Sequence, residues 1–145
     1  GLPHRQEMFF RKKNTYFIND SKATSFEASK FALKGNKNIF WILGGLPKKG
    51  DKFKLGVLKK NIIKAYIVGK SMSIFRRELS GDVNFQLCKT IKNAIDSIFN
   101  DTKNIKNEKI VILLSPSSAS YDQFSNFEER GRYFKKLIIK KFKGN

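Results

Sequence analysis

The chain has 145 residues and a mass of 16.7 kDa, which fits a single domain. Hydrophobic residues make up 40% of it, yet no apolar stretch approaches the ~20 residues that a membrane span needs. The one cysteine, Cys88, excludes an internal disulfide and a cysteine-rich zinc site. These features indicate a soluble cytoplasmic protein. Because the sequence starts at Gly1 and not at a methionine, we expect it to be a piece of a longer protein.

The net charge of +18 comes from 30 Lys and Arg against 12 Asp and Glu, a balance typical of nucleic-acid-binding proteins. Lysine supplies 24 of these cations and arginine only 6, although arginine suits the planar recognition of phosphates and bases better. Lysine, phenylalanine, isoleucine and asparagine share AT-rich codons, so genome composition can explain much of the excess. Nucleic-acid binding is therefore an alternative interpretation and not the first one.

The first third of the chain predicts a strand followed by a helix. Residues 15–18 are β-branched and aromatic, and turn-forming residues follow them. Thr24 and Glu27 have the spacing of a capping box, so we expect a helix that starts at Thr24. Phe31 is expected on its inner face, and Gly35 is expected to end it.

The rest of the chain alternates strands and helices. Continuous apolar runs predict buried strands at 38–43, 63–68 and 110–114, and a shorter strand is expected at 84–87. Helices are expected at 53–60 and 71–79, along the apolar stripe from Ile91 to Phe99, and from Ser125 onwards. This order specifies one α/β domain over residues 1–145, with a mostly parallel sheet and helices on both faces.

Small, polar or basic residues follow three of the predicted strands, at 19–24, 44–51 and 115–127. Ligands of such folds bind outside the carboxyl ends of the strands, so these segments can converge on one cleft. The first segment offers Asp20 and Thr24 just before a helix N-terminus, where an anion is favoured. The alternative is that these two residues only cap the helix.

The other two segments also offer groups for an anion. Gly44 and Gly45 permit a close approach to the backbone, and Lys48 follows, but a plain turn with solvated lysines explains them equally well. Nothing here has the spacing of a P-loop. In the third segment Ser120 is either a ligand or a helix cap, and Asp122 can form a surface ion pair of little value with Arg130.

The sequence offers no catalytic residue and no metal site. His4 is the only histidine, and no cysteine or carboxylate pattern around it indicates a metal site. No serine lies in a nucleophile-elbow motif.

Four groups of residues carry a family resemblance. They are L-P-H-R-x-E from Leu2, F-I-N-D-S-K-A-T from Phe17, G-G at Gly44 with Lys48 and Asp51 beyond it, and S-P-x-x-A-S-x-D-Q-F-x-N-F-E-x-R-G from Ser115. In this order and at these spacings the chain resembles, over its whole length, the C-terminal domain of the Mur ligases.

The resemblance implies a Rossmann-like, three-layer α/β/α domain, the last of three in a cytoplasmic, ATP-dependent ligase of peptidoglycan synthesis. The N-terminal UDP-binding domain and the central ATPase domain, which holds the Mg²⁺ ligands, would be absent from this chain, so the isolated fragment would be inactive. The implied reaction joins D-glutamate to UDP-N-acetylmuramoyl-L-alanine through an acyl phosphate made from ATP. The implied enzyme is a monomer that has neither nucleic acid nor a membrane as a partner.

The family's binding residues transfer to particular positions of this sequence. The resemblance implies contacts to D-glutamate from five residues, namely Lys22, Thr24, Lys48, Ser120 and Phe127. It implies that Arg5 and Asp20 contact ATP. Lys49 is the alternative to Lys48, one position further on. A module that binds an amino acid without catalysis is the alternative to an enzyme domain.

Overall fold

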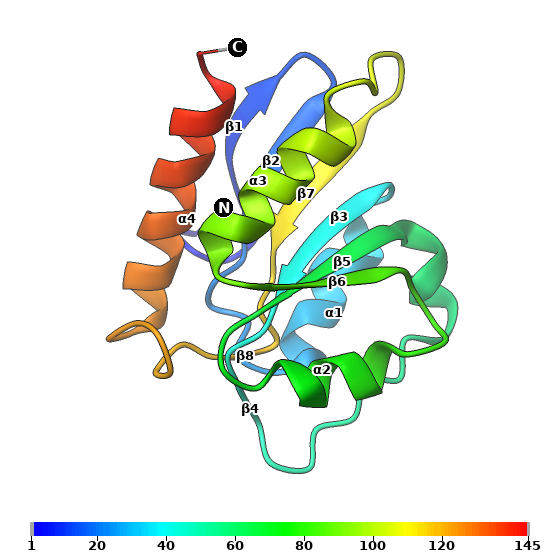
Figure 1. Cartoon of the computed structure of the whole chain (residues 1–145), viewed down its shortest axis with the longest axis vertical. Helices are drawn as coiled ribbons and strands as arrows, with labels where there is room; N and C mark the ends of the chain where they lie inside the picture. The colour runs from blue at the N-terminus through cyan, green and yellow to red at the C-terminus, as the bar shows by residue number, and fades with distance from the viewer. Residues whose placement is uncertain (1, 145) are drawn as a thin grey trace.

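The computed structural model describes residues 2–144. Its strands are β1 (Glu7–Lys12), β2 (Thr15–Asn19), β3 (Ile39–Leu43), β4 (Leu46–Pro47), β5 (Ile62–Val68), β6 (Phe85–Lys89), β7 (Ile110–Leu114) and β8 (Ser118–Ala119). Its helices are α1 (Phe26–Gly35), the 3-10 helix η1 (Gly56–Asn61), α2 (Met72–Leu79), α3 (Ile91–Thr102) and α4 (Phe127–Phe142), as Figure 1 shows.

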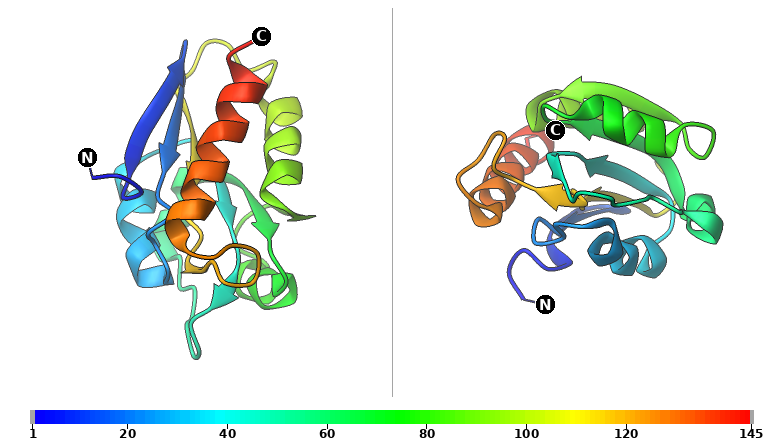
Figure 2. Two further views of the ribbon diagram at one scale, coloured as in Figure 1. Left: turned by 90° about the vertical axis from the view of Figure 1, so that its left-hand side faces the viewer. Right: turned by 90° about the horizontal axis from the view of Figure 1, so that it is seen from below.

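Within these residues one six-stranded sheet runs in the order β1-β2-β7-β3-β5-β6, and β4 pairs with β8 in a small second sheet. In the six-stranded sheet β2, β7, β3, β5 and β6 are parallel and β1 is antiparallel to its neighbour, and β4 and β8 are also antiparallel to each other. Helices α1 and α2 pack on one face, and α3 and α4 pack on the other. Figure 2 shows α1 and α4 on opposite sides of the sheet. The prediction of a mostly parallel sheet covered on both faces is confirmed.

Strand β3 shows why a continuous apolar run forms a strand here. Successive side chains of a strand point to opposite faces, so Trp41 packs into the core beside α1 while Phe40 and Ile42 pack into the core beside α3 and α4. All five residues of β3 are buried. Each large apolar side chain removed from water in this way contributes about 1.5–3 kcal/mol.

The sequence analysis missed strands β1, β4 and β8. Strand β1 is an edge strand whose apolar run, Met8 to Phe10, is short and lies between charged residues, and a bulge between Met8 and Phe10 interrupts its register. Strands β4 and β8 are two residues each and pair across more than seventy residues of chain. Local sequence carries no signal for such a pairing.

The N-caps of the first and last helices each lie one residue beyond the predicted starts at Thr24 and Ser125. The side chain that accepts the N–H of Ala28 is that of Ser25, and Asn126 accepts the N–H of Glu129 at the start of α4. The prediction for Phe31 was wrong, because this side chain is 70% exposed. The inner face of α1 is formed by Phe26, Ser29, Ala32 and Leu33.

Gly131 lies in the middle of α4 and gives a test of this packing. A methyl group at this position would overlap Nδ1 of His4 and would lie 2.9 Å from Nδ2 of Asn19. Replacing glycine by alanine inside a helix normally stabilises it by about 1 kcal/mol. Here we expect Gly131→Ala to lower the free energy of unfolding by about 1–3 kcal/mol because the site is already filled.

The matched control is Gly35→Ala at the end of α1, where an added methyl group would meet nothing within 4 Å. Urea unfolding of both variants measures the difference. Equal stability of the two variants would contradict the packing around His4.

Candidate functional site

Three loops meet at the carboxyl edge of the parallel strands. They follow β2, β3 and β7, and they contain every segment predicted to carry the site. The N–H of Asp20 donates to the carbonyl of Leu114 (2.7 Å), and the N–H of Gly44 donates to that of Pro116 (3.0 Å). Pairing of β4 with β8 joins the second loop to the third. The loops lie at the lower end of the molecule in Figure 1.

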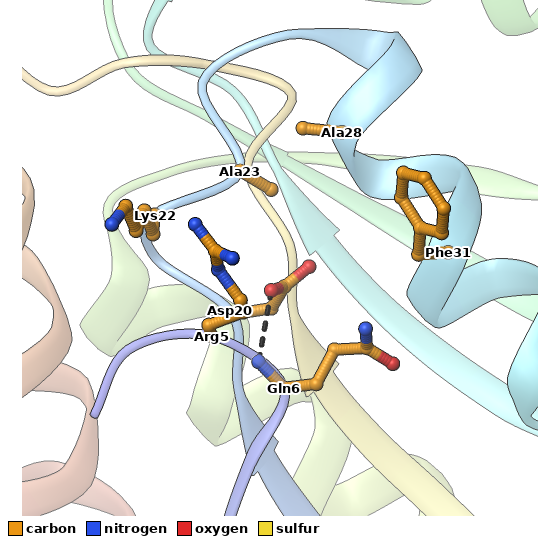
Figure 3. Close-up of a pocket in the computed structure, with 7 residues that line it drawn as sticks. All are labelled: Arg5, Gln6, Asp20, Lys22, Ala23, Ala28 and Phe31. Carbon is orange, nitrogen blue, oxygen red and sulfur yellow. Dashed lines mark hydrogen bonds between the residues drawn. The ribbon is translucent and has the colours of Figure 1, made fainter. Parts of the chain in front are cut away.

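A hollow of about 470 Å³ opens beside the first of these loops. Figure 3 shows the residues that line it, which are Arg5, Gln6, Asp20, Lys22, Ala23, Ala28 and Phe31. The hollow therefore brings together Arg5 and Asp20, both predicted to contact ATP, and Lys22, predicted to contact D-glutamate. Arg5 and Lys22 are exposed, whereas Asp20 is buried.

The carboxylate of Asp20 is held from two sides. One oxygen accepts the N–H of Gln6 (3.0 Å), and the other accepts the hydroxyl of Ser115 (2.7 Å). The Ser115 hydroxyl lies 2.7 Å from that of Ser29, which lies 2.7 Å from that of Ser117, so a buried chain of hydroxyl groups supports the carboxylate. Burial raises the pKa of Asp20, and these hydrogen bonds together with the charge of Arg5 oppose the rise.

Lys22 and Phe127 lie together although 105 positions separate them. The Ser21 hydroxyl donates to the carbonyl of Phe127 (2.7 Å), and the ammonium group of Lys22 lies 5.9 Å from the centre of the Phe127 ring. Phe127 is the first residue of α4, so its N–H belongs to the free N–H groups of a helix start. Glu128 and Glu129 already place negative charge in this first turn.

Arg130 is a buried structural residue and not the partner of a surface ion pair. It is 2% exposed, and its guanidinium donates to the hydroxyl of Ser21 (2.9 Å) and to the carbonyl of the same residue (2.7 Å). Burial lowers the pKa of Arg130 to about 10, which leaves it charged at neutral pH, and Asp122 opposes the shift. Its Nη1 atom is buried and has no hydrogen-bond partner among residues 2–144. The arginine thereby fixes the loop after β2 to helix α4.

Asp122 forms a hydrogen bond to the backbone after β5 in place of the predicted ion pair. Its carboxylate accepts the N–H of Lys70 (3.0 Å) just after β5. The sequence analysis offered a local ion pair of Asp122 with Arg130 at the surface. Asp122 lies in the loop that crosses to β5 and bonds the backbone there, while Arg130 points into the molecule, where the charge of Asp122 still acts on it.

The remaining predicted contacts differ in how accessible they are. Thr24 is exposed because Ser25 takes the capping role. Lys48, also exposed, follows β4, whose pairing with Ser118 and Ala119 puts it on the same rim as Ser120. Ser120 itself is only 2% exposed, and its carbonyl accepts two N–H groups of the following turn. Lys22, Lys48 and Ser120 thus belong to loops at one end of the sheet.

Gly44 and Gly45 are required by the fold itself. Both have positive φ angles, +127° and +146°. A methyl group on Gly44 would overlap the carbonyl of Val68, and one on Gly45 would overlap that of Ala119. The close approach that the sequence reserved for a ligand is made by the chain's own backbone.

Sequence reasoning also missed an N-terminal cluster around His4. His4 is 7% exposed, and its Nδ1 lies 2.9 Å from the amide nitrogen of Asn19. That amide nitrogen also donates to Glu7 (3.0 Å), and Glu7 pairs with Lys135 of α4 (3.0 Å). The cluster fixes the backbone on either side of Arg5 and so sets where this arginine enters the hollow. His4 carried no local signal because its partners are distant in sequence.

Phe31 is the second missed residue, since its ring lines the hollow and is not part of the core. A signal for this existed in the sequence. If Phe26 and Leu33 are taken as the inner face of the helix, Phe31 falls on the opposite side at 100° per residue.

Residues 2–144 contain neither a cluster of metal-ligating side chains nor a membrane-spanning helix. No group of three or more histidine, cysteine, aspartate or glutamate side chains there is arranged to hold a metal ion. No helix in this part of the chain is long and apolar enough to cross a membrane.

No protein-family model matches the chain. Three curated relatives carry the name UDP-N-acetylmuramoylalanine–D-glutamate ligase. The one from Nitrobacter hamburgensis is 41% identical over 138 residues, 95% of this chain and 30% of the relative. Those from Brucella abortus and Rickettsia felis are each 40% identical, over 96% and 94% of this chain and 30% of the relative. The chain thus spans about 30% of the length of these relatives.

Solved structures show the same fold. MurF from Acinetobacter baumannii superposes with a TM-score of 0.62 at 17% identity, over 95% of this chain and 31% of that one. Escherichia coli FolC in complex with ADP superposes with a TM-score of 0.61 at 15% identity, over 97% of this chain and 32% of that one. The chain therefore has the fold of a Mur ligase C-terminal domain. By sequence it is homologous to the Mur ligases named UDP-N-acetylmuramoylalanine–D-glutamate ligase.

The cluster around His4 predicts how stability depends on pH. Burial lowers the pKa of His4 below its usual 6.5, and Lys135 adds to this, while Glu7 opposes it. The unfolded chain therefore binds a proton between that lowered value and pH 6.5 that the folded chain does not bind. The free energy of unfolding should fall as the pH drops through this window and should be unaffected by His4 above it.

His4→Gln removes the only histidine of the chain, so the difference between the two proteins isolates this contribution. We expect the difference in thermal midpoint to change below pH 6.5 and to be constant above pH 7. Parallel pH profiles for the two proteins would show that His4 titrates alike in the folded and unfolded states.

Proposed function

We propose that this chain is the C-terminal, amino-acid-binding domain of an ATP-dependent ligase that joins D-glutamate to UDP-N-acetylmuramoyl-L-alanine. The observation that carries the proposal is the 40–41% identity, over about 95% of the chain, to ligases named for that reaction. The UDP-binding and ATPase domains would form the rest of a monomeric, cytoplasmic protein. The fold and the polar loops at one edge of the sheet are compatible with this role.

In this proposal the site holds D-glutamate by its two carboxylates. Lys22 and Lys48 supply two ammonium groups from separate loops, and charge-assisted hydrogen bonds of this kind are about twice as strong as neutral ones. The hydroxyl of Thr24 and the N–H of Phe127 are the further hydrogen-bond donors to these carboxylates. Ser120 is buried, so it contributes only after its loop opens slightly.

ATP would lie against the hollow between Arg5 and Asp20. A guanidinium suits a phosphate group, and an edge of the Asp20 carboxylate suits a ribose hydroxyl. ATP supplies the phosphoryl group that activates the muramoyl carboxylate, and the Mg²⁺ that accompanies it would be held by the central domain. Support for the ATP proposal is the cationic and aromatic lining of the hollow.

None of these residues is a nucleophile, so the chain would act by positioning. Two fixed carboxylates orient the amine of D-glutamate toward the activated carbonyl, and such orientation can lower a barrier by several kcal/mol. The nearby ammonium groups stabilise negative charge that develops at the transferred phosphate. The domain would also shield the acyl phosphate from water.

Lys48→Ala in the full-length enzyme tests the amino-acid site. Loss of one charge-assisted hydrogen bond costs about 1.5–3 kcal/mol, so we expect the KM for D-glutamate to rise about 10- to 100-fold with a smaller change in kcat. Phosphate release at varied D-glutamate measures this. Lys49→Ala is the matched control and should leave KM unchanged. An effect at Lys49 alone would move the assignment by one residue, and an effect at neither would remove this loop from the site.

Phe31→Ala tests the nucleotide site separately. Loss of the stacking between the nucleotide and the exposed Phe31 ring costs about 1 kcal/mol. The KM for ATP should therefore rise about fivefold while the KM for D-glutamate stays constant. Because Phe31 is 70% exposed, the fold should be unaffected. Phe31→Tyr keeps the ring and should restore the KM. An unchanged KM for ATP in the alanine variant would exclude the ring from the nucleotide site.

A further inference from the structure

Positive charge is concentrated at the edge of the sheet opposite the candidate site. Four segments, residues 11–15, 34–38, 103–109 and 140–144, form what we call the basic end. These 22 residues contain eleven Lys and Arg and one acid, Glu108, so they carry +10 of the net charge of +18. Figure 1 shows the turn between β1 and β2, the loop before β7 and the end of α4 at the top of the molecule.

Hydrogen bonds join these segments into one surface. The carbonyl of Asn14 accepts the N–H of Ile110 (3.0 Å), which fixes the β1–β2 turn to the start of β7. The ammonium group of Lys12 donates to the carbonyl of Phe142 (2.7 Å) at the end of α4. The amide of Asn38 donates to the carbonyl of Lys109 (3.0 Å), so the loop after α1 joins the same surface.

Neither composition nor helix capping accounts for this concentration. An AT-rich genome would spread lysines evenly, yet half of the residues of the basic end are cationic, against 19 of the other 123 residues. Helices α1, α3 and α4 end here, and their dipoles together amount to about −1.5 charges, far less than the charge present. The ion pair of Lys141 with Asp96 (3.3 Å) uses one cation.

A hollow of about 340 Å³ lies within the basic end. Its rim includes Lys12, Lys13, Lys103 and Lys106, and the apolar residues Phe99, Ile105 and Phe142 also line it. Ammonium groups around an apolar floor suit a ligand with an anionic head and an apolar body. A purely polar anion would leave this floor uncovered.

We propose that the basic end docks on the surface of an anionic phospholipid bilayer, with one lipid phosphate held by the lysines of this hollow. Ten of the eleven cations are lysines, which act as point charges on flexible stems and suit a diffuse layer of headgroups. The aromatic rings here are already covered, which disfavours base stacking: Arg11 and Lys109 lie over Tyr16 (4.6 and 4.5 Å), Lys141 lies over the half-buried Phe99 (5.0 Å), and Phe142 is buried.

This inference revises the expectation that no membrane is a partner. The absence of a spanning helix from residues 2–144 does not bear on surface docking, which needs none. Docking by the basic end would leave the candidate site, at the other end of the sheet, facing away from the lipid. The inference does not depend on the proposed ligase function.

Sedimentation of the 145-residue chain with vesicles tests the proposal. We expect binding to vesicles of phosphatidylcholine with 30% phosphatidylglycerol, weakening as salt rises, and none to phosphatidylcholine alone. Each lysine near an anionic bilayer contributes about a fivefold factor in affinity, so Lys13→Gln, Lys103→Gln and Lys106→Gln together should weaken binding on the order of 100-fold. The corresponding triple arginine variant should keep it.

The matched control removes three exposed charges from elsewhere, by Lys54→Gln, Arg76→Gln and Arg77→Gln. This control should bind as the unaltered chain does, apart from a small general effect. Equal losses in the two triple variants would show that only net charge matters and would overturn the proposal. Binding to neutral vesicles, or to a single-stranded RNA but not to anionic vesicles at the same salt, would overturn it as well.

Discussion

The burial of a parallel sheet on both faces is the constraint on which the rest of this structure depends. Strands such as β3 and β7 are buried along their whole length, so no polar group on them can reach solvent through either face. The polar residues nearest to these two strands therefore lie in the loops at their ends. Because five strands of this sheet run in parallel, the loops that follow them reach the same end, whereas the turn after the antiparallel β1 lies at the other end. The convergence of distant segments at that end follows from hydrophobic burial and not from any attraction between them.

The loops at this end are fixed to one another by a few buried polar contacts. Arg130 bonds both the hydroxyl and the carbonyl of Ser21, and the hydroxyl chain behind Asp20 links the loop after β2 to the loop after β7. An unpaired buried polar group costs about 1–3 kcal/mol, so each of these contacts resists a change in loop position. The exposed groups, Lys22, Thr24 and Lys48, are carried by this fixed base and remain available to a ligand.

Sequence predicted well what is decided locally. The short apolar runs at β3, β5 and β7 and the stripe along α3 were assigned from their own residues, and the order of these elements indicated the fold. Prediction from the sequence failed where a residue distant in the chain determines the environment of a side chain. Arg130 was read as a surface residue because its partner Ser21 is 109 positions away, and His4 was given no role because Asn19 and Gly131 complete its site. The loops of the candidate site were predicted, but the burial of Ser120 and the exposure of Phe31 depend on packing that no short window contains.

The two outer strands of the sheet are both irregular, and this has a consequence for self-association. A bulge interrupts β1 between Met8 and Phe10, and the register of β5 with β6 shifts at Val68. Charged side chains follow each irregularity, Arg11 on β1 and Lys89 on β6. An incoming strand from a second copy would meet a broken row of hydrogen-bonding groups flanked by like charges. Irregular backbone and like charges at both edge strands thus disfavour the growth of fibrils by edge-to-edge strand pairing.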